Sequence, residues 1–244
     1  MNFKPLIFSG IILLGACTSA LIGPYSFTYT PIQTNDFEIA TWQHITTASD
    51  PIHIYIEGDG YAFNRSGQPT RDPTPRKHLV RNLASKDTSP NVVYMGRPCQ
   101  YIRGKNCDTT DWTDGRFSKQ IIDNMSQAIK SVAKGRPIIL VGYSGGAMVS
   151  GLVIKQHPEL NIKKWITIAG VLNHKDWTKY FNDKPLSKSL NMNGLPQVSQ
   201  IHYIAEHDSV VPNSLSRKWV SASRLTVIPN AKHDYFPKLD INFK

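Results

Sequence analysis

The feature that most constrains the fold of this sequence is the pentapeptide Gly142-Tyr143-Ser144-Gly145-Gly146. Residues 137–141, which precede it, are apolar and rich in β-branched side chains, as is typical of a buried parallel strand. Residues 147–156, which follow it, predict a helix that ends before Pro158. Between a strand and a helix, a G-x-S-x-G motif forms a strained turn that exposes the serine hydroxyl. The sequence therefore predicts an α/β fold with Ser144 as a nucleophile, and the alternative is a glycine-rich turn with an inert serine.

A nucleophilic serine needs a base and an acid that orients this base, and the C-terminal third of the chain supplies candidates for both. Residues 201–205 predict a strand, and Asp208 lies in the loop that follows it. Residues 224–228 predict a second strand, and His233 lies in the loop after that one. Because loops at the carboxyl ends of parallel strands gather at one edge of an α/β sheet, we expect Ser144, Asp208 and His233 to form a catalytic triad.

Other side chains offer alternatives for the base and the acid. His207 is a rival base, although it lies directly beside the acid loop's aspartate, and Glu206 and Asp234 are rival acids. His174 is expected at the start of a loop, and the remaining histidines fall in strand-like or helical stretches. The sequence contains no metal-ligand spacing, no G-x-G-x-x-G motif and no Walker motif. We therefore expect neither a metal nor a cofactor.

The chain resembles the α/β-hydrolase family from about Phe37 to the C-terminus. Residues 208–212, Asp-Ser-Val-Val-Pro, resemble the acid loop of that family. Residues 231–233 resemble its histidine loop, with lysine at a position where a small residue is commoner. Residues 55–60 and 96–101 look like segments of small bacterial hydrolases.

This resemblance implies the α/β-hydrolase fold, with a mostly parallel central sheet and helices on both faces. Residues 37–42 alternate as an antiparallel edge strand does, and residues 118–129 predict an amphipathic helix. Residues 174–197 leave the only room for a cap, so we expect a minimal cap and an open site.

Acyl transfer also requires donors that stabilise the negative charge on the carbonyl oxygen. The resemblance assigns one donor to the backbone N–H of Gly145 and the other to that of Asp59, in the loop after a strand at residues 52–56. The alternative for this loop is an ordinary Gly-Asp-Gly turn. We expect the carboxylate of Asp59 to point away from the oxyanion or to pair with a cation such as Arg97. Tyr143 and Arg97 are candidate substrate-binding residues.

The N-terminus predicts export. A short basic start is followed by an apolar run that is too short to span a membrane as a mature helix. The run ends in Leu-Gly-Ala-Cys at residues 14–17, which resembles the lipobox of bacterial lipoproteins. We therefore expect a signal peptide at residues 1–16, lipidation of Cys17, a tether at residues 17–33 and a hydrolase domain at residues 34–244. Thr18, in place of an aspartate, favours the outer membrane and a periplasmic location, and the alternative is a plain secretory signal.

The three cysteines fit this interpretation. If Cys17 carries lipid, Cys99 and Cys107 remain as an even pair in an oxidising compartment. They enclose a short polar loop, so we expect a disulfide between them, and two unpaired thiols are the alternative.

Charge and length limit the remaining possibilities. The chain has 244 residues, enough for one α/β domain, and a formal net charge of +10, which favours anionic surfaces or substrates. No nucleic-acid-binding module accompanies this charge, so we expect no nucleic-acid partner. The sequence therefore predicts a serine hydrolase of the cell envelope that acts on a small ester, with thioesters or amides as variants. The alternative is a catalytically silent lipoprotein that uses the fold for binding or assembly.

Overall fold

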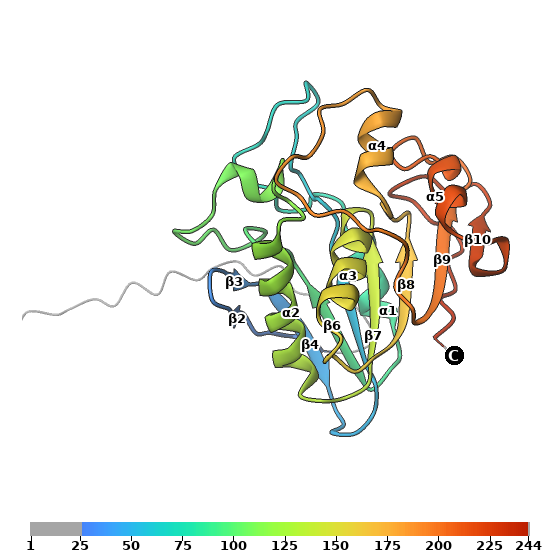
Figure 1. The fold of residues 1–244 in the computed structure, drawn as a ribbon. Coiled ribbons are helices and arrows are strands. Elements are labelled where there is room, and N and C mark those ends of the chain that lie inside the picture. The colour runs from blue at the N-terminus through green and yellow to red at the C-terminus, as the bar shows by residue number, and fades with distance from the viewer. Residues whose placement is uncertain (1–25, 244) are drawn as a thin grey trace, which may run out of the picture.

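The computed structural model describes residues 26–243 and is built around a sheet of eight strands (Figure 1). The strands are β1 (Thr28–Tyr29), β4 (Thr41–Ile45), β5 (Ile52–Ile56), β6 (Asn91–Met95), β7 (Ile138–Tyr143), β8 (Ile162–Ile168), β9 (Ser199–Ala205) and β10 (Leu225–Ile228). Across the sheet they lie in the order β1-β4-β6-β5-β7-β8-β9-β10. All neighbours from β6 to β10 are parallel, whereas β4 is antiparallel to both β1 and β6. The predicted mostly parallel sheet is therefore confirmed.

Helices cover both faces of this sheet (Figure 1). They are α1 (Leu79–Lys86), α2 (Lys119–Ala133), α3 (Gly145–Gln156), α4 (His174–Tyr180) and α5 (Asn213–Trp219), with short 3-10 helices at Thr109–Trp112 and Ala222–Arg224. One hydrophobic core joins α2 and α3 to one face of the sheet. A second core joins α1 and the C-terminal segment to the other face. The chain thus forms three layers, as an α/β domain requires in order to bury a parallel sheet.

Strand β5 shows how the sequence produces this arrangement. Its isoleucines, Ile52, Ile54 and Ile56, belong to the core beneath α2 and α3. Tyr55 faces the opposite core, beside α1. Because successive side chains of a strand point to opposite faces, an apolar run that is buried on both sides must lie inside the sheet.

The N-terminal part of the described chain corrects two expectations. Residues 37–42 do not form the edge strand. Strand β1 pairs with β4 and takes the edge position instead, and the rings of Tyr29 and Trp42 pack 5.0 Å apart across this pair. A separate two-stranded sheet joins β2 (Ile32–Gln33) to β3 (Glu38–Ile39). Residues 28–33, which we assigned to the tether, therefore pack on the domain. The predicted signal peptide and Cys17 lie outside the described residues.

The order of the strands creates a crevice at one edge of the sheet. The chain passes from β5 to β6 on one side and then returns to place β7 on the other side of β5. Ligands bind at such switch points, beyond the carboxyl ends of the strands. The loop after β5 and the turn after β7 meet here, and these carry Asp59 and Ser144.

No helix within residues 26–243 combines the length and the apolar character that a membrane crossing requires.

Candidate active site

Ser144 occupies a sharp turn between strand β7 and helix α3. Its backbone has φ 49° and ψ −120°, a region that residues with a side chain rarely adopt. The turn is possible because Gly146 packs tightly against strand β5, where a methyl group would lie 2.5 Å from the carbonyl oxygens of Ile56 and Glu57. The packing of helix against sheet thus holds the strained serine in place.

The structure brings together the three residues that the sequence suggested for a triad. The Nε2 atom of His233 lies 3.0 Å from the Oγ of Ser144. The Nδ1 atom of His233 lies 2.9 Å from the Oδ2 of Asp208. The Asp208 carboxylate also accepts hydrogen bonds of 2.8 Å from the N–H groups of Val210 and Val211, which fix its orientation. A histidine held in this way donates from Nδ1 and presents Nε2 as an acceptor to the serine hydroxyl.

The rival residues lie elsewhere. His207 is exposed, and its Nε2 lies 3.5 Å from the Oε2 of Glu206. Glu206 accepts a hydrogen bond from the backbone N–H of Asn230, and Asp234 pairs with Lys77 at 2.9 Å. Within residues 26–243, none of the three rivals contacts Ser144 or the ring of His233 through a hydrogen bond or ion pair.

Two backbone N–H groups near the serine are the candidates for an oxyanion hole. Gly145 is the first residue of α3, so its N–H has no acceptor inside the helix. The loop after β5 approaches so closely that a methyl group on Gly58 would lie 3.1 Å from the Cβ of Ser144. The N–H of Asp59, the next residue, donates to no other group within residues 26–243. Both N–H groups are therefore available to a ligand.

The Asp59 carboxylate pairs with Arg97, as we expected, and also with Arg116, whose Nε lies 3.3 Å from its Oδ2. Burial alone would raise the pKa of Asp59, but the charges of Arg116 and Arg97 outweigh burial and hold that pKa below its usual value. The carboxylate is thus ionised and directed toward these cations.

Arg97 does not line the site, which corrects its assignment as a substrate-binding residue. Its side chain is 5% exposed, and its Nη2 donates to the backbone carbonyl of Arg116. Its other terminal nitrogen binds Asp59. Because both terminal groups are used inside the protein, Arg97 supports the loop that carries Asp59.

The predicted disulfide between Cys99 and Cys107 is present. Its loop does not form a wall of the site. It acts one layer behind, where Gln100 donates a 2.9 Å hydrogen bond to the carbonyl of Gly58. The disulfide loop therefore supports the loop that carries Gly58 and Asp59 from outside.

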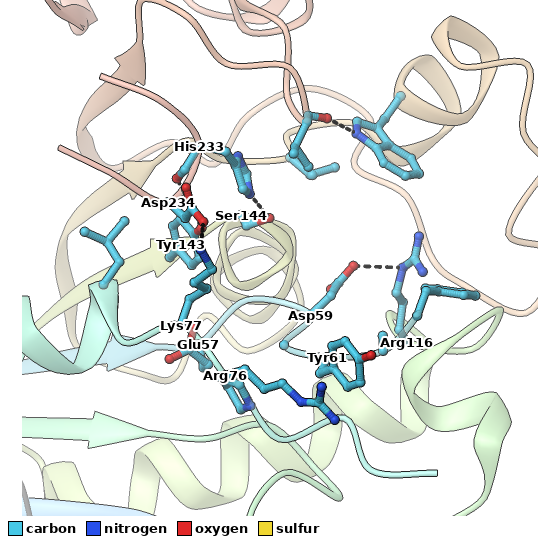
Figure 2. Close-up of a pocket in the computed structure, with 18 of the residues that line it drawn as sticks. Glu57, Asp59, Tyr61, Arg76, Lys77, Arg116, Tyr143, Ser144, His233 and Asp234 are labelled. Atoms are coloured by element: carbon cyan, nitrogen blue, oxygen red, sulfur yellow. Dashed lines mark hydrogen bonds and ion pairs between the residues drawn. The ribbon is translucent and has the colours of Figure 1, made fainter. Parts of the chain in front are cut away.

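A cavity of about 560 Å³ opens beside Ser144 (Figure 2). Tyr143 lines it as expected, and its hydroxyl also donates a 3.1 Å hydrogen bond to the backbone carbonyl of His233. Most of the remaining wall comes from three places: the loop at residues 59–65 and 75–79, the pair Arg116-Phe117, and the segment that carries Val171, His174 and Trp177. Ser144 and His233 both line this pocket.

Comparison with solved structures decides the fold. The chain aligns with an α/β serine hydrolase homologue from Coxiella burnetii at 14% identity and a TM-score of 0.56, over 85% of this chain and 89% of that one. It aligns equally well, with a TM-score of 0.56 and 12% identity, with naproxen esterase from Bacillus subtilis, over 86% of each chain. A thioesterase domain from the curacin biosynthetic pathway gives a TM-score of 0.54 at 10% identity, over 86% of this chain and 95% of that domain.

The chain has the α/β-hydrolase fold. No protein-family model matches its sequence, and no curated protein is similar enough in sequence to count as a match.

Within this α/β-hydrolase fold, sequence reasoning missed part of the pocket. Residues 174–197 do not provide the only covering segment, because residues 60–78 run between β5 and α1 without a long element of their own and form a wall. A loop of that length is often functional, and this signal was available in the sequence. His174 does not begin a loop but helix α4, and it is buried. Arg116 looks like an ordinary surface charge in the sequence, and only the fold places it in the pocket.

Glu57 is another residue that lines the pocket and whose charge depends on its burial. It is 3% exposed, and its carboxyl group accepts hydrogen bonds from the hydroxyl of Tyr94 at 2.6 Å and from the N–H of Gly58 at 3.0 Å. Burial raises the pKa of Glu57 to about 7, although these hydrogen bonds oppose the shift. The pKa of Glu57 therefore lies near neutral pH, directly beside the loop that carries Asp59.

The described part of the chain contains no group of three or more histidine, cysteine, aspartate or glutamate side chains arranged to hold a metal ion.

Proposed function

We propose that this protein is a serine hydrolase that cleaves carboxylic esters, with Ser144 as the nucleophile, His233 as the base and Asp208 as the residue that orients it. The observation that carries the proposal is the chain of contacts from Ser144 Oγ to His233 Nε2, at 3.0 Å, and from His233 Nδ1 to Asp208 Oδ2, at 2.9 Å. Three residues far apart in the sequence meet in the geometry that activates a hydroxyl group.

The mechanism follows from these contacts. The Oγ of Ser144 attacks the ester carbonyl while Nε2 of His233 accepts the hydroxyl proton. Asp208 keeps Nδ1 protonated and stabilises the imidazolium that forms. The backbone N–H groups of Gly145 and Asp59 stabilise the oxyanion, and the amino end of α3 adds its positive dipole. The imidazolium then gives its proton to the leaving alcohol, and a water molecule activated by His233 releases the acid.

The similar structures support hydrolysis, because they include proteins named as a serine hydrolase homologue, an esterase and a thioesterase. An ester asks less of this site than an amide does. An alcohol leaves more readily than an amine, and the site described above offers one proton donor, His233. Thioesters and amides are included as substrates in the experiment described below.

Labelling with a fluorophosphonate probe tests the proposal. We expect the purified wild-type protein to be labelled at Ser144 and the Ser144→Ala variant to remain unlabelled. Turnover of a matched oxygen ester, thioester and anilide then ranks the substrate classes, and we expect the oxygen ester to be cleaved with the highest kcat/KM. A folded wild-type protein that takes no label and cleaves none of the three would instead indicate a silent binding protein.

We further propose that the protein is anchored in the bacterial cell envelope by lipid on Cys17, facing the periplasm from the outer membrane. The lipobox-like sequence at residues 14–17 supports this location, as does the Cys99–Cys107 disulfide, because such bonds persist in oxidising compartments.

A further inference from the structure

The cluster around Asp59 carries more positive than negative charge. Arg97 and Arg116 both lie against the single carboxylate of Asp59. Both arginine side chains are nearly buried, at 5% and 6% exposure. A buried charge without a counter-charge is costly, so an unbalanced cluster of this kind points to a missing anion.

The unbalanced charge belongs to Arg116. Arg97 uses one terminal nitrogen on Asp59 and the other on a backbone carbonyl. The terminal nitrogens of Arg116 donate to no group within residues 26–243, and its Nε makes no hydrogen bond there either, despite lying 3.3 Å from Asp59.

Aromatic rings surround the Arg116 guanidinium without offering an acceptor. The rings of Phe63, Phe117 and Trp177 lie with their centroids 5.7 to 5.8 Å from its central carbon. Phe63, Phe117 and Trp177 line the cavity together with Arg116. Figure 2 shows Arg116 beyond Asp59, on the side of the cavity away from His233. The guanidinium is thus held by cation–π contacts at the cavity wall, where it can meet a ligand.

His174 lies in the same wall, with the backbone of Ser189 and Leu190 close to its ring. It is 1% exposed and stacks on Phe117 with ring centroids 5.9 Å apart. Neither ring nitrogen makes a hydrogen bond within residues 26–243. Burial, together with the nearby charge of Arg116, lowers the pKa of His174 against the opposing effect of the backbone of Ser189 and Leu190, so the ring is neutral at pH 7 and carries one N–H donor.

We infer that Arg116 and His174 bind a carboxylate carried by the substrate, so that the preferred esters are those that retain a carboxylate apart from the scissile ester. This inference rests on the proposed function and names the substrate class of that site. A guanidinium presents two N–H groups to the two oxygens of a carboxylate, and the imidazole N–H adds a third donor. A cavity of about 560 Å³ has room for an ester together with this second group.

The charge count favours a carboxylate over a phosphate. The cluster holds two guanidinium groups and the carboxylate of Asp59, so it lacks a single negative charge whenever Glu57, whose pKa is raised to about 7, is protonated. A monoanion balances it, whereas a phosphate dianion would leave an excess of negative charge beside Asp59.

Other cations near the cavity mouth do not provide this kind of site. Arg65, Arg76 and Lys77 are exposed; Arg76 lies over the ring of Tyr61, and Lys77 pairs with Asp234. Exposed charges steer anions through long-range attraction that salt screens. A test must therefore separate binding at Arg116 from general attraction.

The experiment measures binding without turnover. In a Ser144→Ala background, calorimetry compares the monoethyl esters of succinic, glutaric and adipic acid with the corresponding diethyl esters. We expect at least one monoester to bind about tenfold more tightly than its diester, in line with one charge-assisted, bidentate contact. Arg116→Gln should remove this preference, so that the ratio of monoester to diester affinity falls to about one. Arg71→Gln is the matched control, because Arg71 is exposed on the loop at residues 60–78 but does not line the cavity, and it should retain the preference.

A second variant covers the case in which Arg116→Gln fails to fold. His174→Phe keeps a ring against Phe117 and removes the N–H donor, so we expect it to lower the ratio of monoester to diester affinity several-fold. Equal affinity for monoesters and diesters throughout, or a preference that survives both substitutions, would overturn the inference. Tighter binding of phosphonate analogues than of the monoesters would overturn the assignment to a carboxylate. Since no turnover is needed, a failure of the proposed hydrolysis leaves this result intact.

Discussion

The Nε2 atom of His233 lies 3.0 Å from the Oγ of Ser144, although 89 positions separate the two residues in the sequence. We therefore expect His233→Ala to lower the kcat for an ester substrate by about 10⁴-fold or more, because the serine loses its base. His207→Ala is the matched control, since His207 is exposed and paired with Glu206, and it should keep nearly full activity. Steady-state kinetics decides between the two histidines. A severe loss of activity in His207→Ala with a mild loss in His233→Ala would show that His207, and not His233, is the base.

Replacing the acid should damage catalysis while leaving the fold intact. In Asp208→Asn, the side-chain oxygen can still accept from the N–H groups of Val210 and Val211, which lie 2.8 Å from Oδ1. The amide can no longer hold the correct tautomer of His233, so we expect kcat to fall by roughly 10³- to 10⁴-fold. Circular dichroism should show an unchanged structure, and activity near that of the wild type would argue that Asp208 has no role in catalysis.

Glu57 should make stability depend on pH near neutrality. Its pKa rises from 4.5 to about 7 on folding, so the folded state favours the protonated form. The stabilisation from that protonated form is complete below pH 4.5 and is lost as pH rises through about 7, up to about 3 kcal/mol in total. Urea unfolding of wild type and Glu57→Gln at pH 5, 6, 7 and 8 measures this contribution as the difference between the two profiles. The glutamine variant should lose less stability than the wild type over this range, and parallel profiles would contradict the prediction.

The disulfide should matter for both stability and activity. Cys99 and Cys107 are 8 positions apart, and closing so short a ring stabilises a protein by about 2–3 kcal/mol in the chain-entropy model. The double variant Cys99→Ala/Cys107→Ala should lose about this much free energy of unfolding in urea. Because the same loop holds Asp59 and Gly58 through Arg97 and Gln100, we also expect kcat/KM to fall several-fold well below the melting temperature. An unchanged kcat/KM would leave the bridge a purely structural role.

Lipidation can be tested independently of catalysis. We expect Cys17→Ser to abolish incorporation of a tagged fatty acid and to leave unprocessed precursor or a soluble product. Cys99→Ala/Cys107→Ala is the control, since it removes two cysteines and should still be labelled at Cys17. A wild-type protein that takes up no label would reject the lipobox interpretation.

Local sequence patterns predicted the elements that position the serine. The apolar run before Ser144 and the glycines around it have meaning on their own, because a strand, a tight turn and a helix each depend on nearby residues. Strand β5 and the loop after it could be found in the same way. The triad members were assigned from chain order and resemblance, and the structure adds the distances between them.

The parts that the sequence did not predict depend on contacts between distant segments. Arg97 precedes Cys99 on a loop that leads toward the site, yet the carboxylate of Asp59 draws its guanidinium inward, away from the cavity. Arg116 lies in a loop and His174 begins helix α4, and the two side chains come together where both pack on Phe117. Strand β1 consists of two residues, too few to show a period, and is stabilised by its pairing with β4.

Strand β1 also limits how far the domain can lie from a lipid anchor on Cys17. Its first residue, Thr28, is fixed to the rim of the sheet by pairing with Gln43. With lipid on Cys17, the intervening chain could reach at most about 40 Å when fully extended. The pocket would then be confined to a thin layer of solution next to its own membrane. The esters that reach it would be those released at that surface or small enough to diffuse to it.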